Sequence, residues 1–499
     1  MSKLRFGILV MWGCSLSLPV LGIEPDRQQQ FFSQIQTEHI LKDIQTLSDP
    51  AFQGRQAGTV GGLEAGYYLQ KRFKALGLIP PRPDSQKEDS ASWNQKTPLP
   101  TRHLQGPVTL ELGFIEPISS SPGKNLQIGE EILPVLDSPA SHITAPVIFV
   151  GYGIVDPARG LDNYQGIDVH NRIVLFLRGK PPTYSQWVNH EEKTLIAKEQ
   201  GAAGYITVTG PLLDPYEVRK GLGQSPLALY AGSPDDYPIP GAWISGNAMD
   251  QILQSFNESL ASLQRAANQI STFESRPLPI LAKLHWESHS TSGTLTNVVG
   301  MLPGLDPQLR DEIILIGAHR DHFGIQAGLL FPGADDNASG TAVMLEIARL
   351  FSQNQFRPRR SLLFASFDGE ERGMLGSMIY VENPVLPLEK TLNMINLDHV
   401  GAGNGKLTVG VTRQDKTPIQ QAAEQAGLTD HVQIYGYFPG GDHVPFYEAG
   451  VPTITVVSSG THPHFHQPSD TVESLQPEIL TTSTKFLLTL ITRLADQPP

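Results

Sequence analysis

Asp311-Glu-Ile-Ile-Leu-Ile-Gly-Ala-His319 is an apolar run that ends in a histidine, and it decides how the chain folds. Two later runs have the same form: Ser361-Leu-Leu-Phe-Ala-Ser-Phe leads toward Glu371, and Thr391-Leu-Asn-Met-Ile-Asn-Leu leads into Asp398. Continuous apolar runs of this length, with helical segments between them, are typical of strands buried on both faces of a parallel sheet. The sequence therefore predicts an α/β fold with a mainly parallel, mixed sheet sandwiched by helices.

Polar side chains stand at or just past the ends of these predicted strands. In such sheets, ligands gather at the carboxyl ends of the strands, where the strand order reverses. Two histidines and three carboxylates suit zinc, and a site short of protein ligands leaves room for a reacting water. The candidate metal ligands are His319, Asp335, Glu371, Asp398 and His466. This pattern predicts a hydrolase.

The stretches ILIGAHRDH, FPGADDNASG, FASFDGEER, MINLDHVG and HFHQPSDT resemble the di-zinc aminopeptidases of peptidase family M28. The resemblance covers residues 40–80 and 290–499, and it implies two Zn²⁺ ions per chain. In this interpretation Asp335 bridges the two ions. His319 and Asp398 would complete one site, and Glu371 and His466 the other.

The same resemblance implies catalytic and orienting roles. Glu370, beside Glu371 but not ligating, would act as general base: it would take a proton from the water held by the two metals, leaving hydroxide, and would pass that proton to the departing amine. Asp321, two residues past His319, would orient an imidazole, and Asp470 would do the same near the late histidine. These expectations come from the family pattern.

Tyr437 is the nearest match to the tyrosine that stabilises the oxyanion in the simplest members of the family. It lies one residue further from Asp442 than that pattern requires, and Gly441 replaces the usual serine. Ordinary loop packing is the alternative interpretation of Tyr437.

Several of these residues also have a structural interpretation. The Asp335-Asp-Asn-Ala-Ser-Gly340 stretch would suit a helix N-terminus, and paired glutamates after a strand would suit a solvated loop. Five matches in the right order favour the metal site. His322 and His399, each beside a proposed ligand, are interpreted as structural, and His462 and His464 as loop residues beside His466.

Composition excludes some classes of function. The 499 residues are 39% hydrophobic and 17% charged, as in an ordinary globular protein with two or three cores. The formal net charge is −13, and no basic run could release counterions from nucleic acid. We therefore expect peptide or small protein substrates and no nucleic acid partner, and the oligomeric state stays open.

Residues 1–22 resemble a secretory signal peptide. Lys3 and Arg5 precede an apolar stretch from Phe6 to Leu21, which is too short for a stable membrane span. We expect export to a periplasm or the medium. The single cysteine, Cys14, offers lipoprotein anchoring as the rival interpretation, and cleavage after Gly22 would leave no cysteine.

The remaining chain divides into three parts. Residues 23–129 would begin the catalytic domain and include a flexible segment over 81–105, which is rich in Pro, Ser, Lys and Asp. Residues 130–275 resemble an inserted protease-associated domain, acting as a lid beside the cleft or as a folded spacer. Residues 276–499 would form the main metal-binding part.

Together these features predict an exported zinc aminopeptidase that hydrolyses N-terminal residues of peptides. Two rivals remain open. One is another reaction of the same family, carboxypeptidase action or glutaminyl cyclisation. The other is a non-catalytic binding protein on the same fold.

Overall fold

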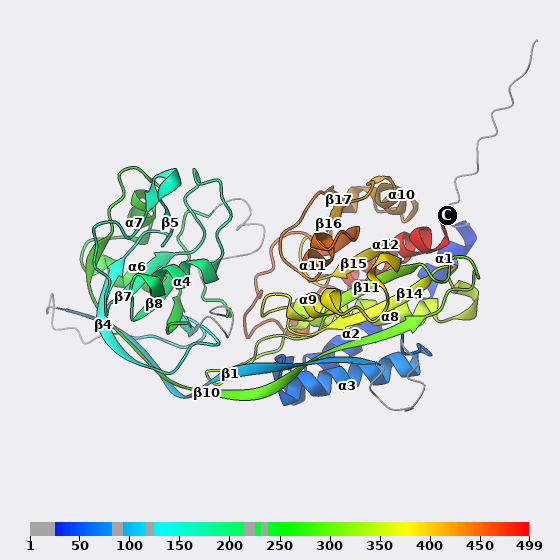
Figure 1. Cartoon of the computed structure of the whole chain (residues 1–499), viewed down its shortest axis with the longest axis horizontal. Coiled ribbons are helices and arrows are strands. Elements are labelled where there is room, and N and C mark those ends of the chain that lie inside the picture. Colours follow the sequence, from blue (N-terminus) through cyan, green and yellow to red (C-terminus); the bar gives the residue numbers. More distant parts are fainter. Residues whose placement is uncertain (1–24, 82–92, 116–123, 214–224, 231–237, 499) are drawn as a thin grey trace, which may run out of the picture.

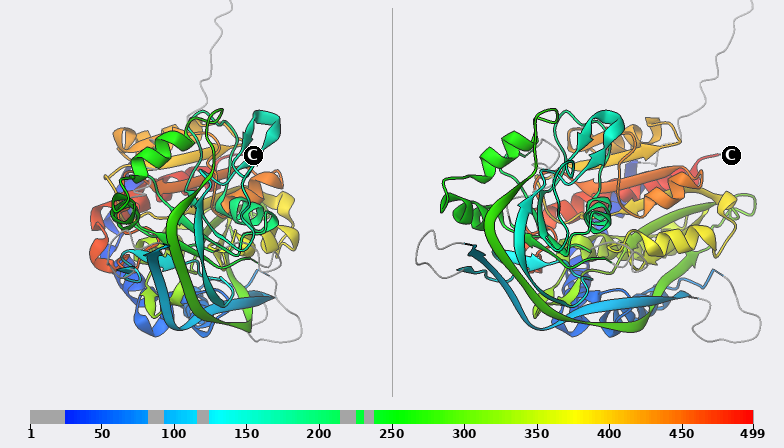
Figure 2. Two further views of the ribbon diagram at one scale, coloured as in Figure 1. Left: turned by 90° about the vertical axis from the view of Figure 1, so that its left-hand side faces the viewer. Right: turned by 60° about the vertical axis from the view of Figure 1, so that its left-hand side comes forward.

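The computed structural model describes residues 25–81, 93–115, 124–213, 225–230 and 238–498. The predicted signal peptide lies outside these residues. The chain forms two lobes joined by a long antiparallel ribbon, which curves beneath both of them (Figure 1; Figure 2). The ribbon consists of β1 (Asn94–Phe114) and β10 (Arg276–Leu302), paired from one lobe into the other.

The larger lobe is built on the mainly parallel, mixed sheet that the sequence predicted. Strand β11 runs parallel to both β14 and β15, and β15 runs parallel to β18. Strand β10 is antiparallel to β14, and β16 is antiparallel to β18 but parallel to β17. The order is β17 (Val432–Tyr435), β16 (Leu407–Thr412), β18 (Thr453–Ser458), β15 (Thr391–Leu397), β11 (Ile313–His319), β14 (Ser361–Phe367) and β10.

Helices cover both faces of this sheet because alternate strand residues point to opposite sides. Ile314 and Ile316 of β11 pack in one core, and Ile313 and Leu315 pack in another. The first core includes α1 (Pro25–Ser33), α2 (Thr37–Leu47), α3 (Val60–Ala75), α8 (Gly340–Phe351), α10 (Thr417–Gln425) and α12 (Pro477–Asp496). The second includes α9 (Leu375–Glu382) and α11 (His443–Glu448).

The smaller lobe, called the inserted lobe below, has a separate hydrophobic core. Its strands are β4 (Ser141–Phe149), β7 (Ile173–Leu177), β8 (Gly204–Val208), β9 (Gly241–Ile244) and β3 (Ile132–Pro134), and its helices are α4 (His190–Glu199), α6 (Gly246–Gln254) and α7 (Leu260–Ala267). The core also takes in Leu104 and Leu112 of β1 and Leu284 of β10. Side chains of the ribbon therefore form part of the hydrophobic core of the inserted lobe.

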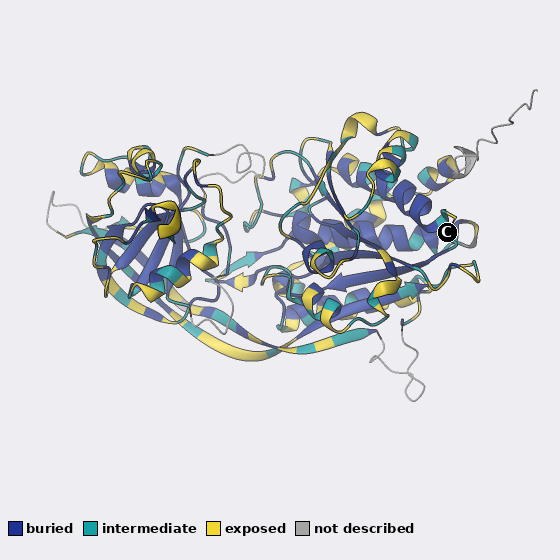
Figure 3. Ribbon diagram, turned by 45° about the horizontal axis from the view of Figure 1, so that its top comes forward, coloured by how far each residue is buried: buried dark blue, intermediate teal, exposed yellow. Residues whose placement is uncertain are grey.

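Residues 94–105 differ from the expectation of a flexible segment. They form the first half of β1, and their register runs from Asn94 opposite Val298 to Gln105 opposite Glu287. The polar residues of this stretch are interspersed with Leu99, Thr101 and Leu104, which are buried, so the stretch forms a strand of the ribbon that crosses between the lobes (Figure 3). Residues 82–92 of the same predicted segment lie outside the described residues.

The remaining described strands are short: β2 (Lys124–Asn125), β5 (Val155–Asp156), β6 (Leu161–Asp162), β12 (Gly324–Gln326) and β13 (Leu329–Phe331). Within the described residues, no helix combines the length and apolarity needed to cross a bilayer.

Candidate metal centre and pocket

The sheet topology brings the predicted site residues to one edge of the larger lobe. His319 is the last residue of β11, Asp398 directly follows β15, and Glu370 and Glu371 follow β14. Because these three strands are parallel, their carboxyl ends meet at the same edge. His466 arrives there from the loop that follows β18.

One group of potential ligands consists of His319, Asp336 and Asp398. Nε2 of His319 lies 3.4 Å from Oδ1 of Asp336 and 3.3 Å from Oδ1 of Asp398. Burial alone would lower the pKa of His319, but the surrounding carboxylates, Glu370 foremost, raise it well above its usual value. The imidazole therefore sits in a strongly negative environment that would favour a cation.

A second group uses the other side of Asp336. It contains His322, Asp336 and Glu371, and Nδ1 of His322 lies 2.6 Å from Oε1 of Glu371. Nε2 of His466 lies 3.1 Å from Oδ2 of Asp336 and 3.4 Å from Oε2 of Glu371. Asp336 thus presents one oxygen to each group.

The residues fit two divalent cations. Neither carboxylate oxygen of Asp336 takes part in a hydrogen bond, and Nε2 of His322 also has no partner, although all three atoms are buried. Buried polar atoms normally have partners, and an unpaired carboxylate in the interior is costly. Cations between the histidines and carboxylates would supply the interactions that the Asp336 carboxylate lacks, and nitrogen with oxygen donors suits zinc.

Asp335 does not occupy the bridging position expected from the sequence, and this residue choice is corrected to Asp336. The Asp335 carboxylate faces away from both groups: Oδ2 lies 2.6 Å from Nδ1 of His462, and Oδ1 accepts a hydrogen bond of 2.8 Å from the amide of Gly401. A shift of one residue reverses the direction of the side chain. The aspartate pair in the sequence offered two candidates, and only packing separates them.

Asp470 holds this aspartate pair in place through the backbone. Its Oδ1 accepts a hydrogen bond of 2.9 Å from the amide of Asp335, and its Oδ2 accepts one of 3.0 Å from the amide of Asp336. The predicted contact with His466 is not the one that the structure gives. Asp470 therefore orients a carboxylate rather than an imidazole.

Asp321 performs a similar task beside β14. Its carboxylate accepts hydrogen bonds from the amides of Glu370 and Glu371, at 3.1 and 3.3 Å. Nδ1 of His319 lies 3.2 Å from the backbone oxygen of Asp321 and 3.6 Å from its carboxylate. Asp321 thus contacts the predicted imidazole chiefly through its carbonyl group, while its side chain fixes the paired glutamates.

Glu370 is placed to act on a substrate. It lines the main pocket, and its Oε2 lies 3.9 Å from Nε2 of His319. Burial raises the pKa of Glu370 well above its usual value, and the neighbouring carboxylates reinforce this shift. A carboxylate with a raised pKa can both accept and return a proton near neutral pH.

Two histidines that were interpreted as structural lie at the centre. His322 contacts Glu371, and Nε2 of His399 lies 3.4 Å from Oδ1 of Asp398 and 3.5 Å from Oδ2 of Asp336. Their only signal in the sequence is adjacency, His322 three residues after His319 and His399 directly after Asp398. Adjacency alone does not fix the direction of a side chain.

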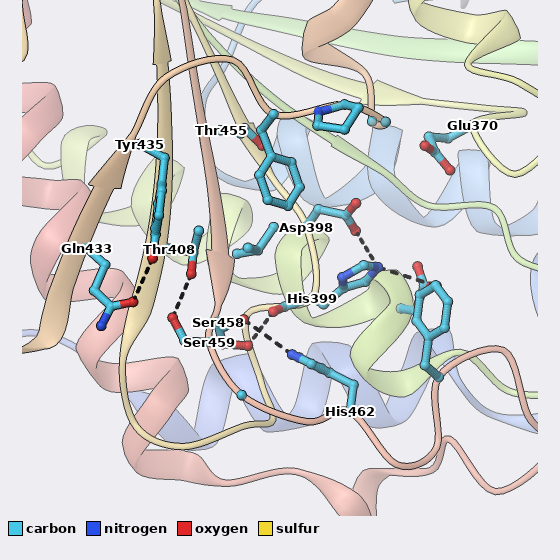
Figure 4. A pocket seen from close by; sticks show the side chains of 18 of the residues that line it. Glu370, Asp398, His399, Thr408, Gln433, Tyr435, Thr455, Ser458, Ser459 and His462 are labelled. Atoms are coloured by element: carbon cyan, nitrogen blue, oxygen red, sulfur yellow. Dashed lines mark hydrogen bonds and ion pairs between the residues drawn. The ribbon is translucent and has the colours of Figure 1, made fainter. Parts of the chain in front are cut away.

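A pocket of about 430 Å³ opens beside the two groups of potential ligands. Its wall carries acidic groups at one end and a mixture of aromatic and small polar side chains at the other (Figure 4). The lining includes Asp336, Glu370, Glu371, Asp398, His399, Thr408, Gln433, Tyr435, Phe438, Thr455, His462, Phe465 and His466. With cations bound among the acids, the rest of the described lining suits an uncharged part of a ligand.

Tyr437 also lines this pocket, and its side chain is largely exposed. The residue has 50% of its surface accessible, and its ring packs 5.0 Å from that of Tyr447. The described contacts leave its role in oxyanion stabilisation a prediction.

Comparison with known proteins adds to this geometry. Residues 297–491 match the model of peptidase family M28. Transferrin receptor protein 2 of Homo sapiens is 28% identical over 291 residues, which are 57% of this chain and 34% of the receptor. Aminopeptidase YwaD of Bacillus subtilis (strain 168) is 30% identical over 201 residues, which are 38% of this chain and 42% of that protein. The chain spans little more than a third of the length of the receptor relatives.

A solved structure extends the likeness of fold to both lobes. The aminopeptidase from Aneurinibacillus sp. strain AM-1 superimposes with a TM-score of 0.65 at 23% sequence identity, over 94% of this chain and 97% of that chain. The matched residues 297–491 contain every potential ligand described above. The sequence match, the fold and the placement of histidines and carboxylates at the strand ends together assign residues 297–491 to peptidase family M28.

Proposed function

We propose that this protein is an exported zinc-dependent aminopeptidase that removes N-terminal residues from peptides. One observation carries the proposal: two groups of histidines and carboxylates share Asp336 at the edge of a pocket into which Glu370 also faces. Membership of peptidase family M28 supports the same activity.

The residues divide between two Zn²⁺ ions. His319 and Asp398 would hold one ion, Glu371 and His466 the other, and Asp336 would bridge them. When bound, the two ions would polarise the scissile carbonyl group and make a water molecule more acidic. His322 would keep Glu371 oriented through its contact of 2.6 Å.

Glu370 would carry out the proton transfers. Its carboxylate would remove a proton from the attacking water and deliver it to the nitrogen of the departing amine. The raised pKa that follows from burial favours this return of the proton. Asp321 would support the role by holding the Glu370 backbone through its amide.

The described side chains that line the pocket argue against recognition of a substrate carboxylate. Four acidic residues face it, namely Asp336, Glu370, Glu371 and Asp398, and none of the described residues lining it is Lys or Arg. A carboxypeptidase needs a cationic group to pair with the C-terminal carboxylate, usually Arg. Asp336, Glu371 and Asp398 are assigned to the ions, and Glu370 is assigned to proton transfer. It is therefore the absence of Lys and Arg among these described lining residues that disfavours carboxypeptidase action.

A binding protein without catalysis is the rival from a different class, since Transferrin receptor protein 2 is among the relatives. Such a protein would not need Glu370 beside the two groups of potential ligands. Glutaminyl cyclisation is the remaining alternative within the family. An aminopeptidase hydrolyses the first peptide bond, a glutaminyl cyclase cyclises an N-terminal glutamine, and a binding protein leaves the peptide unchanged. One set of substrates therefore distinguishes these three functions.

The test combines metal content with hydrolysis. Purified mature protein is measured by mass spectrometry for zinc, and is then offered aminoacyl chromogenic amides, peptides blocked at the N-terminus and peptides that begin with glutamine. Two zinc ions per chain and cleavage only of free N-termini would support the proposal. Cleavage from the C-terminus, cyclisation, or full metal loading without turnover would overturn it.

Export has a separate test. Sequencing the N-terminus of protein recovered from the periplasm or the medium would find a chain that begins at Ile23. A chain retained in the cytoplasm with Met1 intact would contradict this part of the proposal.

A further inference from the structure

A short segment of the inserted lobe, Leu227-Ala-Leu-Tyr230, lies against the loop that carries His466. The amide of Ala228 donates a hydrogen bond of 2.9 Å to the carbonyl oxygen of His466, and Nδ1 of His466 lies 3.1 Å from the carbonyl oxygen of Ala228. The amide of Leu136 donates 2.9 Å to the oxygen of Leu229, which ties the segment to its own lobe. We call these four residues the 227–230 segment.

The hydrogen bond to Ala228 decides which nitrogen of His466 faces the potential ligands. A carbonyl oxygen can only accept, so Nδ1 must carry the proton. Nε2 is then left with its lone pair, and it points to Asp336 and Glu371 at 3.1 and 3.4 Å. Fixing the second nitrogen in this way sets both the tautomer and the ring orientation of a metal-binding histidine.

Apolar contacts hold the same ring from its faces. The rings of Phe465 and His466 are stacked at 3.7 Å with an angle of 19°, and Phe465 packs with Leu227 and Trp243 of the inserted lobe. Phe323 meets the imidazole edge-on at 4.6 Å. The segment thus contributes to the hydrophobic wall behind His466 as well as to its hydrogen bond.

Tyr230 reaches the neighbour of a second potential ligand. Its ring lies 5.1 Å from the guanidinium group of Arg372, which directly follows Glu371, and 5.5 Å from the ring of Phe323. The side-chain amide of Gln56 donates a hydrogen bond of 3.4 Å to the Tyr230 hydroxyl. Tyr230 is therefore held between both lobes and restrains the chain next to Glu371.

We propose that the 227–230 segment is a positioning element for the second zinc ion, so that the inserted lobe helps to set the affinity of the Glu371–His466 side of the centre. This inference rests on the proposed function, because it assumes that two ions are bound. Neither a lid nor a spacer would need these contacts. Among the described residues, no hydrogen bond or ring contact joins the segment to His319 or Asp398, so the affinity of that side should not depend on the segment.

The test measures zinc binding itself. Full mature protein is stripped with a chelator and titrated with Zn²⁺ alone by calorimetry, with melting curves to confirm that each variant is folded. Ala228→Pro removes the amide that donates to the backbone carbonyl of His466, and so loosens the backbone pairing that places the Ala228 carbonyl against Nδ1 of His466. Leu227→Ala leaves all backbone groups in place, and Tyr230→Ala removes the ring beside Arg372. Trp187→Ala is the matched control, since Trp187 is an exposed aromatic of the same lobe outside the pocket lining.

The native chain and Trp187→Ala should bind two ions. In the Ala228→Pro and Tyr230→Ala variants one of the two ions should lose roughly 10- to 100-fold in affinity, while the other is unchanged, as is typical when a group that orients a ligand is lost. Leu227→Ala should give a smaller loss of the same ion. Unchanged binding of both ions by folded variants would overturn this inference alone. Fewer than two ions on the native chain would overturn the proposed function as well.

Discussion

Asp335 and Asp336 are neighbours in the chain, yet their carboxylates serve different parts of the site. Asp335 bonds His462 and the amide of Gly401, while Asp336 faces the potential ligands with neither oxygen hydrogen-bonded. Both amides are held by the single carboxylate of Asp470. The pair therefore combines an orienting residue with a ligand.

This relationship predicts opposite results for two matched substitutions. Asp336→Asn removes the charge that both ions would share, and should lower zinc content below one ion per chain and activity by about 100-fold or more. Asp335→Asn keeps a hydrogen-bonding side chain of the same size and should retain most of the zinc. Metal analysis of both purified variants decides, and the reverse pattern would restore Asp335 as the bridging residue.

The sequence predicted the fold and most of the site because it records what lies at the end of each strand. Apolar runs ending in His319 or Asp398 specify both a buried parallel sheet and the edge where polar groups meet. The choice between Asp335 and Asp336 depends on how the chain turns before α8. Such a turn is set by contacts with residues more than a hundred positions away, such as Asp470.

Contacts between the lobes were also beyond the sequence. The sequence around Ala228 does not distinguish this residue from other small residues of the inserted lobe. Its contact with the site is made by its backbone carbonyl, which accepts from Nδ1 of His466. His322 and His399 could be recognised in the sequence as neighbours of proposed ligands, but the sequence did not show that their side chains point toward the site. Periodicity predicts which side chains are buried, and it does not predict which backbone groups meet across a domain boundary.

Glu370→Gln should separate catalysis from metal binding. The amide cannot accept the proton of the attacking water, so kcat should fall by about 10²- to 10⁴-fold, the range that positioned acid–base groups contribute. Zinc content should stay at the native value, because the proposed ligands are untouched. Glu382→Gln, an exposed glutamate of α9, is the control and should keep full activity. Loss of zinc from Glu370→Gln would move Glu370 into the set of ligands.

We expect substitution of Arg55 to lower the free energy of unfolding strongly. It is fully buried, and its guanidinium group donates hydrogen bonds to the carbonyl oxygens of Arg320, Leu47, Pro332 and Gly333. These bonds join the end of α2, the residue after His319 and the loop before Asp335. Arg55 thus fastens the frame around the candidate centre.

Arg55→Met should lower the free energy of unfolding by about 3–5 kcal/mol, because four buried carbonyl oxygens lose their donors. Arg72→Met is the comparison: Arg72 pairs with Asp43 at 2.7 Å but is partly exposed, so its loss should cost only about 1 kcal/mol. Urea denaturation of the zinc-loaded proteins measures both. Equal losses in the free energy of unfolding would show that the buried hydrogen bonds of Arg55 stabilise the fold no more than the partly exposed ion pair of Arg72.

The inserted lobe should have its own sensitivity to acid, through His190. Burial lowers the pKa of His190 to about 3, and the positive charges of Lys193 and Arg178 add to the shift. Its Nε2 lies 3.3 Å from the hydroxyl of Tyr205, and its ring packs against Phe176. In the folded chain the imidazole therefore stays neutral, whereas in the unfolded chain it takes up a proton below about pH 6.5.

Below about pH 6.5 the unfolded chain binds a proton at His190 that the folded chain does not bind. The free energy of unfolding is therefore highest above about pH 6.5 and decreases as the pH falls toward 3. His190→Gln cannot be protonated, so the difference in melting temperature between pH 7.5 and pH 5 should be smaller in the variant than in the native chain. For this one group we expect the free energy of unfolding at pH 5 to be lower than at pH 7.5 by about 1–2 kcal/mol, a value that allows for the partial exposure of His190. His170→Gln, an exposed histidine of the same lobe, is the matched control and should leave the difference unchanged. The same acid sensitivity in His190→Gln and the native chain would mean that His190 is protonated in the folded lobe without cost.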